Sequence, residues 1–384
     1  MHLQEDADKG DVLAQYELAR RYEYGNDMDQ DKEMALYWYR KAAEGGSIPA
    51  ASKLSWIYSS ATGKVVTRDY VEAERWCRIA AEAGDPSAQC RMGWLYELGY
   101  GGLEKNYPEA LKWYTLAAEN GNATGMANLG NMYLNGRAVE KNYEIARQWI
   151  EQAAKQGNAY AYSRMGRIYE YGYGVDVDLV EAYKWYLKGA EKGDANCQHA
   201  VAFCLRHGRG CKKDDAASAE WYFKAIENGM EDDWYSLGSV LYDLKRYNDS
   251  VRCFEKAYLQ KHSGAATFLG YCYENGHGVE KNYLKAKDLY EEDAQSGYAD
   301  GYYYLARLHE KGQFMPVSSV KEAKKAIKTI KGLYKKAAEA GSKRAKDRLK
   351  AFESKGYTIR FDDKKGRHVT FSKGPQGVSL QYDI

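Results

Sequence analysis

The chain has 384 residues and a formal net charge of +2, with 56 Lys and Arg residues against 54 Asp and Glu residues. This near equality of basic and acidic residues argues against bulk electrostatic attraction to nucleic acid or to an anionic membrane. The 36 tyrosines are abundant, but a repeated pattern places most of them, so their number does not indicate a cofactor site.

The repeated pattern begins close to the first residue, with Ala7, Ala14, Leu18 and Tyr22 already in register. No apolar run approaches the roughly 18 residues of a membrane-spanning helix. We therefore expect no signal peptide, no membrane segment and a cytoplasmic protein. A secreted or periplasmic mature form, from which a signal has been removed, is the alternative.

Residues 158–193 form one unit of the pattern. Ala161, Met165 and Ile168 recur at helical spacing and predict a first amphipathic helix. A Gly-Tyr-Gly turn at 172–174 interrupts it, and a second helix ends at Gly193. We interpret the Gly-x-Gly as a turn and not as a nucleotide loop, because no strand precedes it.

Copies of this unit follow one another at a constant spacing. The glycines that close the second helices are 36 to 38 residues apart, at Gly46, Gly84, Gly121, Gly157, Gly193 and Gly229. The first helices share a Leu-Gly or Met-Gly pair, whose small residue lets two helices approach closely. The second helices share Ala-x-x-Trp, as at Ala73 and Trp76. Such a dense repeat predicts an α-solenoid.

The pattern resembles the Sel-1-like repeat, a relative of the tetratricopeptide repeat, over nearly all of residues 7–341. The resemblance implies an all-α fold, a right-handed superhelical α-solenoid of about nine helix-turn-helix repeats over residues 1–341. It also implies that the first helices line a concave face that binds a partner. Family members act as adaptors in protein complexes.

Repeat six contains Cys197, His199, Cys204, His207 and Cys211, which invites a metal interpretation. The spacing matches no standard zinc motif, and we favour buried thiols with two surface histidines. The seven cysteines do not recur at one repeat position, which indicates reduced thiols.

The last third of the chain departs from the pattern. Repeat seven, about 230–261, resembles a plain tetratricopeptide repeat with a shorter loop between its helices. Repeat nine carries an insertion around residues 314–316, and Ser319 with Glu322 predicts a capping box. Residues 342–355 predict a capping helix, and 356–384 alternate like a short β-meander.

Residues 321–350 hold twelve Lys and Arg residues against three acidic ones. We interpret this stretch as a solvated helix face or a contact for an acidic protein. Nucleic acid is disfavoured, because no series of aromatic side chains accompanies the charges.

By resemblance to tetratricopeptide arrays, the concave face carries the residues two before and two after the Leu or Met of the Leu-Gly pair. Aromatic and Arg side chains dominate protein interfaces, although some of these residues could instead pack into a neighbouring helix. The predicted protein-binding groove comprises Tyr16, Arg20, Trp56, Trp94, Asn131, Arg167, Phe203, Tyr235, Tyr271, Tyr303 and Arg307.

The leading interpretation is a non-catalytic scaffold or adaptor that binds a protein or peptide in this groove. We assign no catalytic, cofactor-binding or metal-binding residue. An immunity protein that neutralises a toxin is an alternative within the binding class. The alternative of another class is a β-lactam-binding or β-lactam-hydrolysing enzyme like some secreted, Cys-rich relatives. The chain lacks a Ser-x-x-Lys with the companion motifs of that chemistry.

Overall fold

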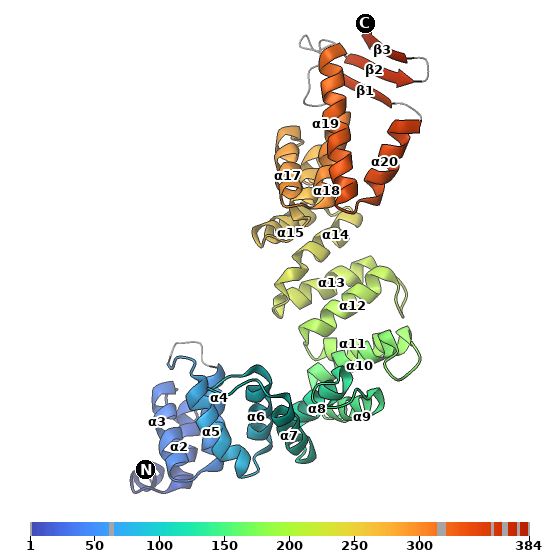
Figure 1. Ribbon diagram of the computed structural model, residues 1–384. Helices are drawn as coiled ribbons and strands as arrows, with labels where there is room; N and C mark the ends of the chain where they lie inside the picture. Colours follow the sequence, from blue (N-terminus) through green and yellow to red (C-terminus); the bar gives the residue numbers. More distant parts are fainter. Residues whose placement is uncertain are drawn as a thin grey trace. The chain divides into compact units, whose positions relative to one another are not determined.

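The computed structural model describes residues 2–60, 65–312, 320–354, 357–362, 368–374 and 377–382 (Figure 1). The predicted insertion at 314–316 and Ser319 of the predicted capping box lie outside the described residues. The chain divides into two compact units, residues 1–197 and 198–384, which we call the N-terminal and C-terminal units. Paired helices form a repeat solenoid, as the sequence predicts.

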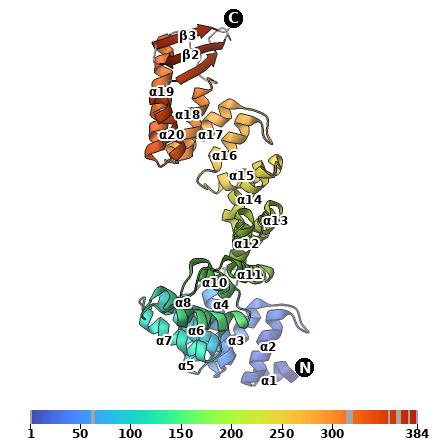
Figure 2. The same cartoon turned by 90° about the vertical axis from the view of Figure 1, so that its right-hand side faces the viewer.

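In the N-terminal unit each helix packs against the next one along the chain (Figure 2). A short helix, α1, precedes the first repeat and was not predicted. The bounds are α1 (His2–Asp8), α2 (Val12–Tyr24), α3 (Lys32–Glu44), α4 (Ile48–Ser60), α5 (Tyr70–Glu82), α6 (Pro86–Leu98), α7 (Tyr107–Glu119), α8 (Ala123–Asn135), α9 (Tyr143–Lys155), α10 (Ala159–Tyr171) and α11 (Leu179–Glu191).

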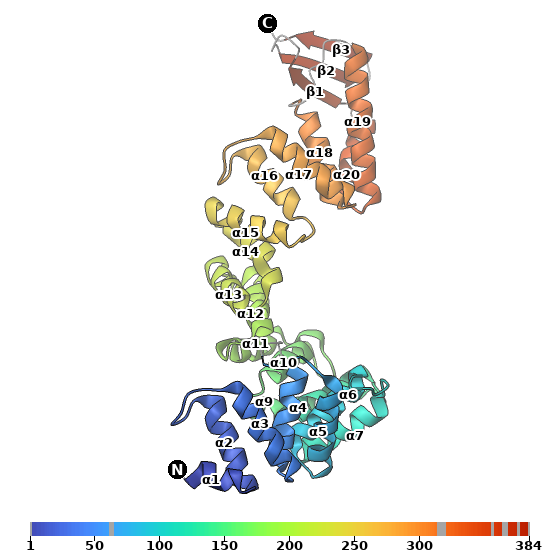
Figure 3. The same cartoon turned by 90° about the vertical axis from the view of Figure 1, so that its left-hand side faces the viewer.

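Helix α12 (Ala195–His207) contains the boundary between the units, and the C-terminal unit continues the pairs (Figure 3). Three strands follow the last helix and pair antiparallel in the order β1-β2-β3. The bounds are α13 (Asp215–Glu227), η1 (Glu231–Asp233), α14 (Trp234–Asp243), α15 (Tyr247–Leu259), α16 (Ala265–Asn275), α17 (Tyr283–Gln295), α18 (Ala299–Glu310), α19 (Val320–Glu339), α20 (Lys343–Ser354), β1 (Tyr357–Asp362), β2 (His368–Gly374) and β3 (Gly377–Tyr382).

Local side chains set where most helices begin and end. The carboxylate of Asp31 accepts hydrogen bonds from the backbone N–H groups of Glu33 and Met34, which opens α3. Asp and Asn residues open the other second helices of the N-terminal unit in the same way. Five first helices end at a glycine in the left-handed conformation, such as Gly172 with φ 69°.

The two helices of a repeat touch through the small residue of the Leu-Gly pair. A Cβ added to Gly93 would lie 2.6 Å from the ring of Tyr114 on the second helix. Gly166 faces the ring of Tyr186 in the same way. The predicted close approach of the two helices is therefore confirmed, and the neighbour at this point is a tyrosine ring.

The hydroxyl of that tyrosine donates a hydrogen bond to a glutamate of the first helix, five residues after the Leu or Met. We call this contact the tyrosine–glutamate pair. Its oxygen–oxygen distances lie between 2.6 and 2.8 Å. The pairs are Tyr39–Glu23, Tyr114–Glu97, Tyr186–Glu170, Tyr290–Glu274 and Tyr334–Glu310.

A basic side chain from beyond the repeat usually neutralises the glutamate. Lys53 Nζ lies 2.6 Å from Glu23 Oε1, and Arg137 Nη1 lies 2.5 Å from Glu97 Oε1. Arg348 of α20 pairs with Glu310 of α18. Because each cation lies beyond the repeat that holds the glutamate, these ion pairs fasten neighbouring elements of the solenoid together.

Glu274 is the most deeply buried member, with a side chain 1% exposed. Arg307 Nη2 lies 3.0 Å from Glu274 Oε1, and Lys311 Nζ lies 2.5 Å from the same oxygen. Burial alone would raise the pKa of Glu274. The hydrogen bond from Lys311, the charge of Arg307 and the hydroxyl of Tyr290 outweigh burial and lower this pKa.

We expect Glu274→Gln to lower the free energy of unfolding by about 3 kcal/mol, because Arg307 and Lys311 lose their buried counter-charge. Urea denaturation at neutral pH measures this loss. Glu339→Gln is the control, since Glu339 belongs to an exposed ion pair with Lys335 and should cost less than about 1 kcal/mol. Equal losses in the two variants would contradict the assignment.

Acid should remove the difference between wild type and Glu274→Gln. A lowered pKa stabilises the fold fully above the ordinary value of 4.5, and that contribution is lost as the pH falls through the folded-state pKa. Repeating the denaturation at pH values from neutral to 3 should show the gap between the variants closing only below 4.5. A gap that does not change with pH would exclude this linkage.

Candidate functional site

The first helices of repeats two, three and four lie side by side and together line a cavity of about 450 Å³. Most of the residues that line it have polar side chains, and they include one guanidinium and one indole. The lining residues are Ser59 and Ser60 of α4, Ser87, Cys90, Arg91 and Trp94 of α6, and Asn122, Thr124 and Asn128, of which the last two belong to α8.

Arg91 stands where the pattern of ion pairs changes. It directly precedes Met92, as Lys53 precedes Leu54 in the repeat before, and Lys53 pairs with Glu23. The corresponding acceptor for Arg91 is Ser59, whose Oγ lies 2.7 Å from Arg91 Nη1. A neutral hydroxyl thus replaces the carboxylate that the neighbouring repeat supplies.

The guanidinium of Arg91 is half-buried, and burial lowers its pKa. Within the described residues no carboxylate lies in ion-pair range of it. The nearby thiols do not supply a charge near neutral pH, because burial raises the pKa of Cys77 to about 12 and that of Cys90 to about 11. A half-buried cation without a counter-charge is unfavourable by itself and attracts an anion.

Trp94 forms the aromatic side of this cavity. Its ring centroid lies 5.8 Å from that of Tyr70 and 5.3 Å from that of Tyr100, and the two tyrosines stack on each other. Trp56 is 49% exposed on α4, and Lys53 Nζ lies 4.8 Å from the centroid of its ring. Of the residues predicted for the groove, only Trp94 lines the cavity itself.

The other predicted groove residues of the N-terminal unit differ in exposure. Tyr16 is half-buried against the ring of Tyr39, at 5.7 Å. Arg20 is exposed and pairs with Glu17 of its own helix. Asn131 accepts a hydrogen bond from Asn135, and Arg167 is exposed over the ring of Tyr171.

In the C-terminal unit the predicted groove residues are half-buried and engaged in local contacts. Tyr235 stacks on His262 at 4.4 Å, and Arg307 holds Glu274. The remaining contacts are those of Phe203 with His207, Tyr271 with Tyr304 and Tyr303 with Tyr334.

The Cys/His cluster of repeat six is not gathered into a metal site. Cys197 and Cys204 are buried, and His199 Nδ1 lies 2.7 Å from the buried carboxylate of Asp233. No group of three or more His, Cys, Asp or Glu side chains suited to a metal occurs in the described part of the chain. Among those residues, no helix is long and apolar enough to cross a membrane.

Comparison with known proteins decides the family. The Sel1 repeat matches eight segments, residues 12–47, 48–85, 86–122, 123–158, 159–194, 195–230, 263–298 and 299–342. The chain belongs to the Sel1 repeat family. The matches skip 231–262, where repeat seven departs from the pattern. No curated protein matches this Sel1 repeat chain in sequence.

Two solved Sel1 repeat structures are similar to the chain over most of its length. A protective antigen present in uropathogenic Escherichia coli strains, with a Sel1-like repeat fold, is 31% identical over 91% of this chain and 74% of that chain, with a TM-score of 0.73. A Sel1 repeat protein from Oxalobacter formigenes is 28% identical over 80% of this chain and 90% of that chain, with a TM-score of 0.55.

A more distant structure shares the fold alone. It is a signal transduction ATPase with a tetratricopeptide repeat sensor from Pyrococcus horikoshii. That protein is 17% identical over 88% of this chain and 55% of that chain, with a TM-score of 0.53.

Sequence reasoning missed Arg91, although the sequence contains a signal for it. The signal appears when the repeats are aligned on the Leu or Met and two positions are compared together. The residue directly before the Leu or Met is basic in repeats two and three, as Lys53 and Arg91. The residue five after it, which would face that basic side chain from the preceding repeat, changes from Glu23 in repeat one to Ser59 in repeat two.

We expect Arg91→Met to raise the free energy of unfolding by about 1 kcal/mol, since it removes a buried charge that lacks a counter-charge. The matched control is Arg137→Met, which removes the partner of Glu97 and should lower that free energy by about 2 kcal/mol. Urea denaturation at pH 7 measures both. A loss of stability in both variants would show that Arg91 is held mainly for the fold.

Proposed function

We propose that this Sel1 repeat protein is a non-catalytic interaction scaffold, whose N-terminal unit binds a carboxylate-bearing segment of a partner protein. Sel1 repeats generally mediate protein interactions, which supports the binding class. The proposal rests on Arg91, a half-buried cation that donates a hydrogen bond to the hydroxyl of Ser59. Lys53, the residue at the same position in the repeat before, instead pairs with the carboxylate of Glu23.

The cavity around Arg91 suits an Asp, Glu or C-terminal carboxylate. A carboxylate seated there gains a charge-assisted hydrogen bond from the guanidinium. Hydroxyl groups of Ser87 and Thr124 and the amide of Asn128 offer further donors along the walls. The indole of Trp94 supplies the apolar contact that interface hot spots typically add.

The exposed groove residues extend this proposal along the first helices of the N-terminal unit. Trp56 is about half exposed on α4, the helix that contributes Ser59 and Ser60 to the cavity, and Arg20 and Arg167 are exposed cations on other first helices. A partner that is acidic over several residues would contact these positions in addition to Arg91. The localisation in the cytoplasm remains part of this proposal.

An immunity role is a special case of this proposal, in which the bound partner is a toxin. The identity of the captured protein separates it from a general adaptor. No arrangement of a nucleophile, base and oxyanion donors was identified in the sequence, and the β-lactam alternative is tested by a chromogenic β-lactam assay.

The test is affinity capture with the tagged full-length chain in its native host, read by mass spectrometry. We expect one dominant protein with wild type, lost with Arg91→Met and reduced with Trp56→Ala. Val71→Ala is the control, because Val71 is 62% exposed on the second helix α5. A partner retained equally by all variants would refute a site at Arg91.

A synthetic peptide from the captured partner then tests the chemistry. Replacing its Asp or Glu by the corresponding amide should weaken binding about 30-fold or more, as should Arg91→Met. The two changes together should weaken binding little beyond either one alone, because they remove the same contact. Fluorescence anisotropy gives the dissociation constants, and fully additive effects would contradict the contact.

A further inference from the structure

In regular repeats the loop between the two helices rests on the repeat before. The second glycine of the loop makes this contact. A Cβ added to Gly101, at φ +74°, would lie 2.6 Å from the carbonyl oxygen of Tyr70 and 2.8 Å from Cβ of Glu74. A Cβ on Gly174 would lie 2.7 Å from Cβ of Tyr143. Each loop thus covers the start of the preceding second helix.

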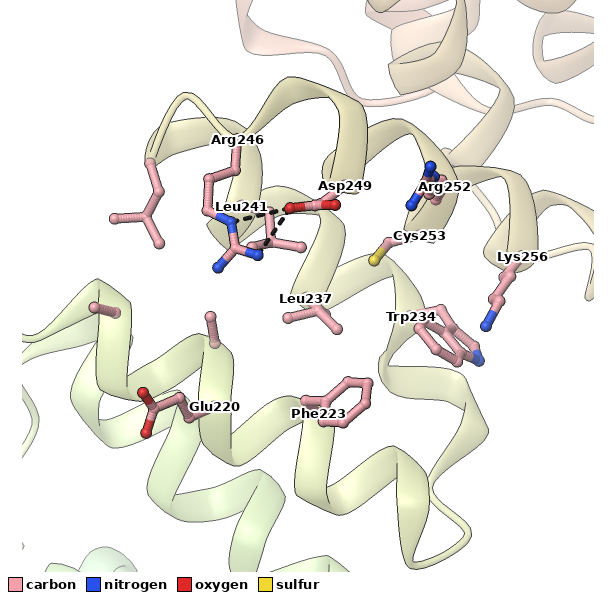
Figure 4. Close-up of a pocket in the computed structure, with 13 residues that line it drawn as sticks. Glu220, Phe223, Trp234, Leu237, Leu241, Arg246, Asp249, Arg252, Cys253 and Lys256 are labelled. Atoms are coloured by element: carbon pink, nitrogen blue, oxygen red, sulfur yellow. Dashed lines mark hydrogen bonds and ion pairs between the residues drawn. The ribbon is translucent and has the colours of Figure 1, made fainter. Parts of the chain in front are cut away.

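Repeat seven lacks this cover. Only residues 244–246 join α14 to α15, so the loop is too short to reach back over α13. Counted from the first residue of the helix, Ala219 of α13 corresponds to Glu74 of α5. Ala219 lines a cavity of about 630 Å³ between α13, α14 and α15 (Figure 4). The missing loop accounts for this opening.

The cavity has an apolar floor. Leu237, Leu241 and Cys253 line it, with Phe223 below Leu237 and Trp234 to its right in Figure 4. Phe223 is 47% exposed, so part of its ring is available to a side chain that enters the cavity. A volume of this size accommodates one or two large side chains of a partner.

The edge formed by α15 is basic. Arg246 is paired with Asp249, and its Nη2 lies 2.8 Å from the carboxylate. Lys256 lies 3.7 Å over the ring of Trp234. Arg252 is exposed and has no ion-pair partner within the described part of the chain. Figure 4 shows Arg252 and Lys256 on α15, across the cavity from Glu220 of α13.

We infer that this cavity is a second docking site, which takes an acidic amphipathic segment of a partner protein. An aromatic or aliphatic side chain of that segment fills the apolar floor. An Asp or Glu close to it in the sequence pairs with Arg252 and Lys256. Charge complementarity decides the chemistry of the occupant, because no carboxylate in the described ranges of the chain forms an ion pair with Arg252 or Lys256.

The site is independent of the one at Arg91, because it lies wholly within the C-terminal unit. Its test is a selection of displayed 12-residue peptides on the purified full-length chain. We expect enriched peptides that combine an aromatic or aliphatic residue with a nearby Asp or Glu. Peptides lost with Arg91→Met belong to the first site and are set aside.

Three variants then decide whether the remaining peptides occupy the cavity. Ala216→Trp fills it from an exposed position, and Arg252→Glu reverses the charge at its edge. Each should raise the peptide dissociation constant at least tenfold in fluorescence anisotropy. Lys212→Glu is the matched control, since Lys212 is exposed and does not line the cavity. Thermal unfolding by circular dichroism verifies that each variant is folded.

Three results would overturn the inference. The first is that no peptide of this composition is enriched. The second is that the enriched peptides bind Ala216→Trp as tightly as wild type. The third is saturable binding of dodecanoate without peptide enrichment, which would assign the cavity to small amphipathic anions.

Discussion

The tyrosine–glutamate pair, which recurs in five repeats, is the interaction on which the regular part of the solenoid depends. A carboxylate inside a protein is tolerated only when hydrogen bonds and an opposite charge compensate its lost hydration. The tyrosine of the same repeat supplies the hydrogen bond at Glu23, and Lys53 of the next repeat supplies the charge. The same contact therefore joins the two helices of one repeat and fixes the position of its neighbour.

Both candidate binding sites lie where this regular scheme is interrupted. Repeat two replaces the glutamate by Ser59 and the tyrosine by Cys77, which leaves Arg91 without a counter-charge. Repeat seven has Tyr242 and Phe254 at those two positions and shortens its loop, which opens the cavity beside α13. Sequences usually break their own structural rules at functional sites, and here the rule is explicit enough to expose the exceptions.

The sequence was sufficient for the solenoid, because constant spacing, glycine turns and buried Ala-x-x-Trp faces are local signals. It was weaker for the site. Trp94 was placed at a cavity, but Tyr235 and Tyr271 pack against neighbouring rings. Arg307 neutralises Glu274, although its position suggested a groove residue. Whether such a side chain faces a groove or packs locally depends on which side chain of the adjacent repeat lies within contact distance. The periodic pattern within one repeat does not give the distances between repeats.

The repeat architecture explains how such exceptions are tolerated. Each repeat contacts only its neighbours, so the cost of losing one tyrosine–glutamate pair stays local. Repeat four shows the apolar solution, with Leu134 and Ile150 at the two positions of the pair. The next repeat keeps an arginine opposite in both cases, repeat two and repeat four. Arg164, opposite Leu134, lies over the ring of Tyr160 at 4.5 Å, whereas Arg91 faces Ser59 and lines the cavity. The carboxylate proposed as the ligand of this cavity would supply the anion that offsets the desolvation of Arg91.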